Sequence, residues 1–273
     1  MGRAEAGTDQ MGWLGLQGRV CAVTGVAGGL GRAIALGFAA AGAKLLLLDR
    51  DTADMEALAR AVAEAGGEVL ARPCNVASSE AVAAAAAIAE ERFGGCDILV
   101  NNAALLRPGP LATLSLAEWN ALISVNLTGY FLCAQAFSAG MRARGRGSIV
   151  HIASIAGRHP QGSSGAYSVT KAGVLMLSQQ IATEWGRDGI RSNVVSPGLV
   201  MTPMSKPFYD APGVLEQRSA AVPAGRIGQP EDVRDAVLFL ASERAAYVTG
   251  EEITVDGGFT HGIMNLIPRP GYG

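Results

Sequence analysis

Three residues in the middle of the chain, Ser154, Tyr167 and Lys171, carry side chains that can move a proton. Tyr167 and Lys171 are four residues apart in a predicted helix, so their side chains share one face of it. A free phenol has a pKa of about 10 and is a poor base near neutrality. We expect the Lys171 ammonium to lower that pKa, so that Tyr167 acts as a general acid and base. Ser154 ends a predicted strand, where its hydroxyl can stabilise charge on a reacting oxygen.

A glycine-rich turn, residues 24–31, lies upstream of this group and directly follows an apolar run. Gly25, Gly29 and Gly31 lack side chains, which permits a tight turn, and a helix that begins there offers unpaired N–H groups to a pyrophosphate. A plain turn can have the same composition. Because reduction of a ketone needs both a proton and a hydride, the turn and Tyr167 together indicate a nicotinamide-dependent oxidoreductase.

An acidic residue, Asp49, ends the second predicted strand, 18 residues after Gly31. At about this distance a carboxylate accepts hydrogen bonds from the adenosine ribose and repels a 2′-phosphate. The neighbouring Arg50 could instead attract that phosphate, and Asp49 could simply cap the following helix. We expect NAD as the cofactor.

The predicted elements alternate between short apolar strands and longer helices. Strands are predicted at 19–24, 44–49, 68–72, 97–101, 148–154, 191–196 and 252–256, and helices begin near Gly29, Thr52 and Ser78. The strands are nearly unbroken apolar runs, which is typical of strands covered on both faces. The alternation predicts an α/β fold with a doubly wound parallel sheet in a single domain.

Composition narrows the class of protein. The 273 residues include 22 Lys and Arg against 24 Asp and Glu, so there is no basic excess for nucleic acid. No apolar run approaches the roughly 20 residues that cross a bilayer, so no membrane partner is expected. The histidines lack metal-ligand spacing, and His151 is expected to be a core residue. The cysteines form no close pair and indicate buried, reduced thiols in a cytoplasmic protein: Cys21, Cys74, Cys96 and Cys133.

In the order and separation of its motifs, the chain resembles the short-chain dehydrogenase/reductase family, of the simple single-domain type. The match spans about residues 15–258 and rests on Thr24-Gly25-x-x-x-Gly29-x-Gly31, Asn101-Asn102-Ala103-Ala104, Asn126, Ser154, Tyr167-x-x-x-Lys171 and Pro197-Gly198. The resemblance implies a Rossmann fold and an NAD(H)-dependent enzyme that interconverts a secondary alcohol and a ketone. Two positions depart from the family pattern: Asn75 replaces a common aspartate, and Ala104 replaces a frequent glycine.

The resemblance also assigns roles to single residues. Lys171 is expected to hold the nicotinamide ribose, Asn126 a water that links Lys171 to solvent, and Asn101 the sheet or the adenosine side. Asn126, Ser154, Tyr167 and Lys171 form the expected catalytic group. Besides Tyr167 and Lys171, the expected cofactor contacts are Gly25, Gly29, Leu30, Gly31, Asp49, Arg50, Asn75, Val76, Asn102, Ala103, Pro197, Gly198, Val200 and Thr202.

We divide the chain into a flexible leader (1–15), a catalytic domain (16–258) and a tail (259–273). Residues 199–222, the lid segment, are rich in proline and methionine and are expected to be a mobile lid, although a packed surface excursion fits as well. Candidate pocket-wall residues imply an apolar alcohol or ketone: Leu105, Leu106, His159, Met201 and Met204.

We expect the apolar tail to pack at a subunit interface, although packing on its own subunit fits as well. The resemblance implies a homotetramer, which we expect to assemble partly through the helices that contain Asn126 and Tyr167.

Two other functions fit the same motifs. A nicotinamide-binding redox sensor would use the glycine turn, but it has no chemical need for Ser154, Tyr167 and Lys171. An epimerase or dehydratase could use the fold and the tyrosine in another reaction.

Overall fold

The structure is a computed structural model that describes residues 12–262, 267 and 271. Its centre is a seven-stranded sheet in the order β3-β2-β1-β4-β5-β6-β7, in which every neighbouring pair is parallel. The strands are β1 Val20–Thr24, β2 Lys44–Asp49, β3 Val69–Pro73, β4 Ile98–Asn101, β5 Gly147–Ile152, β6 Ile190–Pro197 and β7 Glu252–Val255. All seven predicted strands are confirmed, each to within two residues at its ends.

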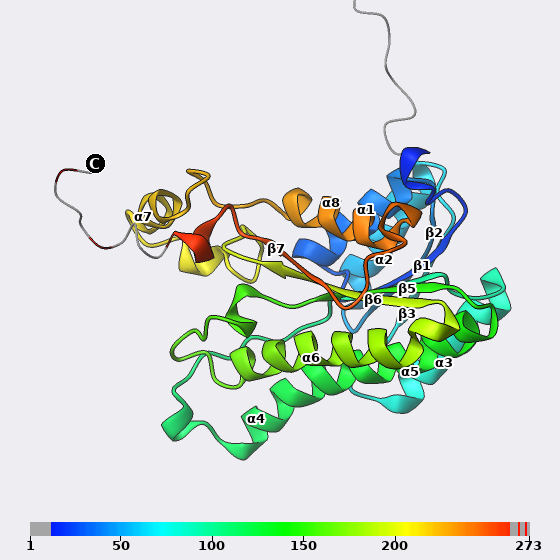
Figure 1. The fold of residues 1–273 in the computed structure, drawn as a ribbon, viewed down its shortest axis with the longest axis horizontal. Coiled ribbons are helices and arrows are strands. Elements are labelled where there is room, and N and C mark those ends of the chain that lie inside the picture. Colours follow the sequence, from blue (N-terminus) through cyan, green and yellow to red (C-terminus); the bar gives the residue numbers. More distant parts are fainter. Residues whose placement is uncertain (1–11, 263–266, 268–270, 272–273) are drawn as a thin grey trace, which may run out of the picture.

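Helices cover both faces of the sheet (Figure 1). One face carries α1 Gly29–Ala40, α2 Thr52–Glu64 and α8 Pro230–Ala241. The other face carries α3 Ser79–Phe93, α4 Leu116–Ile123, α5 Gly129–Ala143 and α6 Tyr167–Trp185. The short helix α7 Val214–Ala221 lies at one end of the molecule, beyond the sheet. The predicted doubly wound α/β fold is therefore confirmed.

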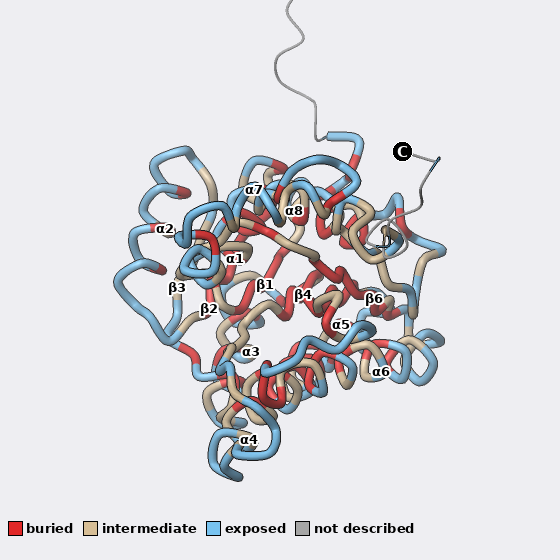
Figure 2. The backbone as a smooth tube through the Cα atoms, turned by 90° about the vertical axis from the view of Figure 1, so that its left-hand side faces the viewer, coloured by how far each residue is buried: buried red, intermediate tan, exposed pale blue. Residues whose placement is uncertain are grey.

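Strand β2 shows why the chain folds in this way. Leu45 and Leu47 point into the core beneath α1, α2 and α8, whereas Leu46 and Leu48 point into the core on the side of α3 and α5. Successive side chains of a strand face opposite ways, so only an unbroken leucine run can fill both layers. Figure 2 shows the buried strands between the two helical layers.

The sheet has its topological switch point at β1, which pairs with β2 on one side and β4 on the other. The chain therefore winds in opposite directions from β1. Such a reversal leaves a crevice beyond the carboxyl ends of the strands, which is where open α/β sheets bind ligands.

One helical stretch differs from expectation. Leu116–Ala143 comprises α4, a π-helical turn Ser124–Thr128 and α5, and it is long and apolar enough to cross a membrane by length and composition. The expectation that no run reaches this length is wrong for this stretch. In the fold, Cys133 and Phe137 of α5 pack into the core beside the sheet, and a core helix passes the same composition test.

The ends of the predicted domain lie partly outside the described residues. Gly12–Leu14 forms a 3-10 turn in which Leu14 is buried in the core and the Trp13 carbonyl accepts a hydrogen bond from Arg244 at 2.6 Å. Part of the predicted leader is thus packed. In the predicted tail, Ile263, Met264 and Leu266 lie outside the described residues, and Ile267 is exposed.

All four cysteines are buried and free, as expected. Burial raises the pKa of the Cys96 thiol to about 12.

Candidate active site

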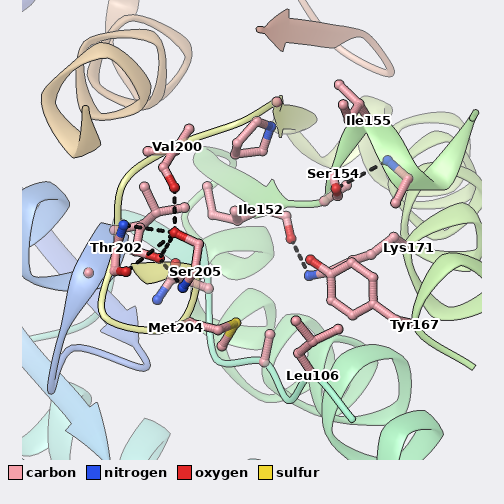
Figure 3. Close-up of a pocket in the computed structure, with 18 of the residues that line it drawn as sticks. Leu106, Ile152, Ser154, Ile155, Tyr167, Lys171, Val200, Thr202, Met204 and Ser205 are labelled. Carbon is pink, nitrogen blue, oxygen red and sulfur yellow. Dashed lines mark hydrogen bonds between the residues drawn. The ribbon is translucent and has the colours of Figure 1, made fainter. Parts of the chain in front are cut away.

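A cavity of about 940 Å³ lies at the carboxyl ends of the strands. Its lining combines the ends of β2, β4, β5 and β6 with the glycine turn and the lid segment. Figure 3 shows Ser154, Tyr167 and Lys171 on one side of it, facing Val200 and Thr202 on the other. Residues far apart in the sequence therefore line one cavity.

The glycine turn is shaped by close contacts between backbone segments. A Cβ atom on Gly31 would lie 2.0 Å from the Gly25 carbonyl oxygen, and one on Gly25 would lie 2.6 Å from the Ala103 Cα. Gly31 itself does not line the cavity. Its lack of a side chain thus serves the packing of α1 against the turn, whereas Gly28 and Gly29 face the open space.

The start of α1 offers donors to that space. Gly28 is the N-cap of α1, and no side chain caps the helix there. The first N–H groups of a helix have no partner within it, and together with the helix dipole they attract an anion. These residues therefore fit a pyrophosphate in the cavity.

Asp49 is held beside the glycine turn. Its carboxylate accepts hydrogen bonds from the backbone N–H groups of Ala27 at 2.8 Å, Arg50 at 2.7 Å and Asp51 at 3.1 Å. The N-cap of α2 is Asp51, so Asp49 does not cap that helix. A fixed carboxylate that lines the same cavity as an open helix N-terminus fits the ribose end of a dinucleotide.

Two asparagines of this region form hydrogen bonds with the backbone nearby. Asn102 donates to the carbonyls of Thr24 at 3.0 Å and Gly25 at 2.8 Å, which closes the glycine turn from β4. The Asn75 oxygen accepts from the Ala77 N–H at 3.2 Å, so its amide nitrogen remains free to donate. Both residues line the cavity, but the side chain of Asn102 mainly supports the turn.

Tyr167 begins α6, and Ser154 follows the end of β5. The Ser154 hydroxyl accepts a hydrogen bond from the Ala156 N–H at 3.1 Å, which leaves its own proton available to the cavity. Burial raises the pKa of Tyr167, and Ser154 offsets only part of this rise. The expected lowering of this pKa is therefore absent, because the phenol is removed from water.

Lys171 lies one helical turn after Tyr167 and is almost completely buried. Its Nζ donates to the Ile152 carbonyl at 2.7 Å and to the Tyr130 hydroxyl at 3.3 Å, and it lies 5.7 Å from the Tyr167 ring centroid. Burial lowers the pKa of Lys171 to about 7. Since burial favours the neutral form of each group, the phenol keeps its proton and the amine is only partly charged near neutral pH.

Tyr130 was not anticipated from the sequence. Its hydroxyl donates to the Ile152 carbonyl at 3.0 Å, so it shares that acceptor with Lys171. It lies four residues after Asn126 in one helical stretch, which places it on the same face. That spacing was the signal available in the sequence.

Asn126 is buried in the π-helical turn and does not line the cavity. Its oxygen accepts from the Leu105 N–H at 2.7 Å, and its nitrogen donates to the Leu105 carbonyl at 2.9 Å and the Thr170 hydroxyl at 3.3 Å. The side chain therefore holds the Leu105 segment of the cavity wall, and its expected link to a water remains a prediction.

His151 is a core residue. Its ring nitrogens contact the Asn101 amide and the Ser192 hydroxyl, each at 3.2 Å, and burial lowers its pKa to about 3. Asn101 also donates to the Tyr130 carbonyl at 3.1 Å, so it steadies the sheet against α5. Within the described residues there is no cluster of His, Cys, Asp or Glu that could hold a metal ion.

The lid segment is anchored at its N-terminal end, residues 200–205. Val200 forms a bridge with Gly228, and Thr202 lies over Gly29, where an added Cβ would be 3.3 Å away. Ser205 ties this root together by donating to the Val200 carbonyl at 2.6 Å. By contrast, α7 has no buried residue.

The cavity gathers nearly all the expected cofactor contacts; only Gly31 is outside its lining. The expected wall residues Leu105, Leu106, His159 and Met204 line it, whereas Met201 does not. Sequence reasoning also missed polar lining residues, which no local motif marks: Gln161, Gln217, Arg218 and Thr260.

Comparisons with known proteins agree with this geometry. A family model described as enoyl-(acyl carrier protein) reductase matches residues 25–260. Galactitol 2-dehydrogenase (L-tagatose-forming) from Cereibacter sphaeroides is 41% identical over 248 residues, which cover 90% of this chain and 96% of that protein. D-threitol dehydrogenase from Mycolicibacterium smegmatis is 38% identical over 245 residues, which cover 90% and 94%.

A solved structure is similar over the same range. Gluconate 5-dehydrogenase from Burkholderia cenocepacia, in complex with NADP and tartrate, has a TM-score of 0.86 and 36% identity and covers 90% of this chain and 96% of that chain. Sequence identity at this level, over nearly the full length of both chains, extends the likeness beyond the fold. The chain therefore belongs to the short-chain dehydrogenase/reductase family and is an oxidoreductase that acts on CH–OH groups.

Proposed function

We propose that this protein interconverts a secondary alcohol and a ketone with NAD(H), and that Tyr167 is the general acid and base. The observation that carries the proposal is the convergence of Tyr167, Ser154 and Lys171 on the cavity that also contains the glycine turn. The names of the relatives, which include two polyol dehydrogenases, support a small hydroxylated substrate.

A bound nicotinamide nucleotide would supply or take up the hydride. During reduction Tyr167 gives its phenol proton to the substrate oxygen, and during oxidation it takes the hydroxyl proton back. Ser154 donates a hydrogen bond to the same oxygen as charge develops on it. Lys171, held by the Ile152 carbonyl, restores the proton of Tyr167 and holds the ribose of the nucleotide. Because burial raises the pKa of Tyr167, the phenol carries the proton that it is to give at neutral pH.

Asp49 supports NAD over NADP. A 2′-phosphate at the ribose would meet a carboxylate that three backbone N–H groups hold in place. The exposed Arg50, which also lines the cavity, is the opposing feature, and the solved relative above contains NADP. Nucleotide preference therefore belongs in the first experiment.

That experiment follows NADH and NADPH absorbance while the protein is offered a panel of alcohols and ketones. We expect turnover with NAD(H), and the Tyr167→Phe variant should lose at least about 100-fold in kcat, because a positioned acid or base contributes that much. Tyr247→Phe is the matched control, since Tyr247 is fully exposed and does not line the cavity. Full turnover by Tyr167→Phe would contradict the mechanism, and preference for NADPH would contradict the role of Asp49.

Product analysis distinguishes the other functions. An epimerase or dehydratase would give products without net consumption of NADH, and a redox sensor would bind nucleotide without turnover.

We also propose a homotetramer in the cytoplasm. The outer faces of α5 and α6 expose Phe131, Val169 and Met176, which supports assembly through these helices. Light scattering on the purified protein tests the assembly.

A further inference from the structure

The lid segment places a cation at the cavity. Arg218 of α7 is half-buried and lines the cavity. Its guanidinium carbon lies 4.9 Å from the ring centroid of Tyr209 and 5.9 Å from that of Phe208. Tyr209 is itself buried, at 8% exposure. Two aromatic rings, one of them anchored, therefore position the guanidinium.

No acidic side chain neutralises this cation among the described residues. Arg218 takes part in none of their ion pairs or side-chain hydrogen bonds, and the lid carboxylate of Asp210 is paired with Lys206 at 2.9 Å. Asp49 is the one acidic residue in the described lining of the cavity, and backbone N–H groups already bind it. The donors of Arg218 are thus available to a ligand.

The rest of this lining is polar as well as apolar. Gln217, Gln161 and His159 contribute groups that can bind hydroxyls, while Leu106 and Met204 contribute apolar surface. Figure 3 shows the side chains of Met204 and Leu106 between Thr202 and Tyr167 in this view. An apolar substrate, as expected from the sequence, would exclude water from the half-buried Arg218 without supplying a partner for its charge.

We infer that Arg218 binds a carboxylate of the substrate, so that the preferred substrates are hydroxy acids and their keto forms; this inference rests on the proposed alcohol dehydrogenase function. A guanidinium stacked on a ring presents its N–H groups at the edge, where two of them match the oxygens of a planar carboxylate. Tyr167 acts on a hydroxyl at another carbon of the same molecule. The acid group thereby selects the substrate, and it takes no part in the proton transfer.

The test uses pairs of substrates that differ only at one end. D-Gluconate and D-glucitol, and L-threonate and L-threitol, each pair a carboxylate with a hydroxymethyl group on a chain of equal length. Wild-type protein should favour the acids in kcat/KM. Arg218→Gln should reduce kcat/KM for the acids at least about tenfold, through KM, while the values for the neutral alcohols change less than about threefold. Arg218→Lys, which keeps the charge without the planar fork, should recover part of the loss.

Controls separate this role from others. Lys206→Gln removes a lid cation that does not line the cavity, and it should leave the preference unchanged. The fluorescence of bound NADH, titrated in each variant, shows whether Arg218 binds the nucleotide instead.

Three results would each overturn the inference and leave the proposed function intact. The first is an equal loss of kcat/KM on acids and alcohols in Arg218→Gln, and the second is weaker NADH binding in that variant. The third is turnover of neutral alcohols with no turnover of the acids. Absence of turnover on every alcohol with either nucleotide would instead overturn the proposed function, and this inference with it.

Discussion

Two parts of the cavity, the side formed by Tyr167 and Lys171 of α6, here called the floor, and the lid segment, are held in different ways. On the floor, Tyr167 and Lys171 belong to a long helix packed on the sheet, and Lys171 is 1% exposed with two hydrogen-bond acceptors. In the lid segment, Met204 and Phe208 are 49% and 39% exposed, and α7 has no buried residue. The floor is therefore part of the core, whereas much of the lid segment adds little buried area.

This difference separates two tasks. Proton transfer needs fixed geometry, which elements with large buried area provide, whereas substrate choice needs only a few contacts from a segment positioned by that scaffold. Changes in the lid segment should alter selectivity at small cost in stability. Changes beneath the floor should alter folding or nucleotide binding.

The largest effect is expected at the glycine turn. Gly31→Ala should lower the free energy of unfolding by about 3 kcal/mol or more, because the new Cβ would lie 2.0 Å from a backbone oxygen. Gly28→Ala is the matched control, since its Cβ would meet nothing closer than 3.8 Å. It should fold normally but bind NADH more weakly, because it narrows the phosphate end of the cavity. Chemical denaturation measures the stability of the two variants, and NADH titration measures their nucleotide binding. Equal stability of the two variants would contradict this account.

A smaller change in the free energy of unfolding, in this case an increase, is expected when Lys171 is replaced. Its folded-state pKa is lowered from 10.5 to about 7, so between these values the unfolded state binds more protons and stability rises with pH. Lys171→Met should therefore stabilise the protein by an amount on the order of 2 kcal/mol below pH 7, and by less at pH 10, while activity is lost.

Thermal unfolding of wild type and Lys171→Met at pH 6.5 and pH 10 checks this sign. Lys44→Met removes a partly exposed lysine paired with Glu68 and should change stability by less than about 1 kcal/mol at either pH. A destabilised Lys171→Met would show that its hydrogen bonds to Ile152 and Tyr130 outweigh the cost of burial.

The smallest effect on stability is expected in the lid segment. Phe208→Ala should change the free energy of unfolding by less than about 1 kcal/mol, yet it should raise KM for acids several-fold, because Arg218 loses one of its two rings. Phe38→Ala, in the core of α1, should cost about 3–5 kcal/mol. If the two phenylalanines cost the same, the lid segment is part of the core and the comparison fails.

The strands and the placement of Tyr167 and Lys171 on one helix could be predicted because their signals are local. An unbroken leucine run such as that of β2 is legible without its neighbours, and Tyr167 and Lys171 meet through helix geometry alone. Their pKa values could not be predicted in the same way. We expected the ammonium to act on the phenol, but burial governs both groups.

Contacts between segments that are distant in sequence were harder to predict. Gly31 and Asn126 fit the motifs, yet neither lines the cavity. Gly31 packs against Gly25 and Asn102. Asn126 forms hydrogen bonds with Leu105 and Thr170. Met201 belongs to the lid segment but does not line the cavity, since proximity in sequence does not fix the direction of a side chain in an irregular segment.

The order of the elements and the position of Tyr167 and Lys171 on one helix face follow from the chain alone, since each depends on periodicity or on spacing within one element. Packing decided the rest: the raised pKa of Tyr167 and the lowered pKa of Lys171, the contact of Tyr130 with Lys171, and the position of Arg218 at the cavity. These features depend on how much water the fold excludes and on which remote side chains it brings within a few ångströms, and neither quantity is local to a stretch of sequence.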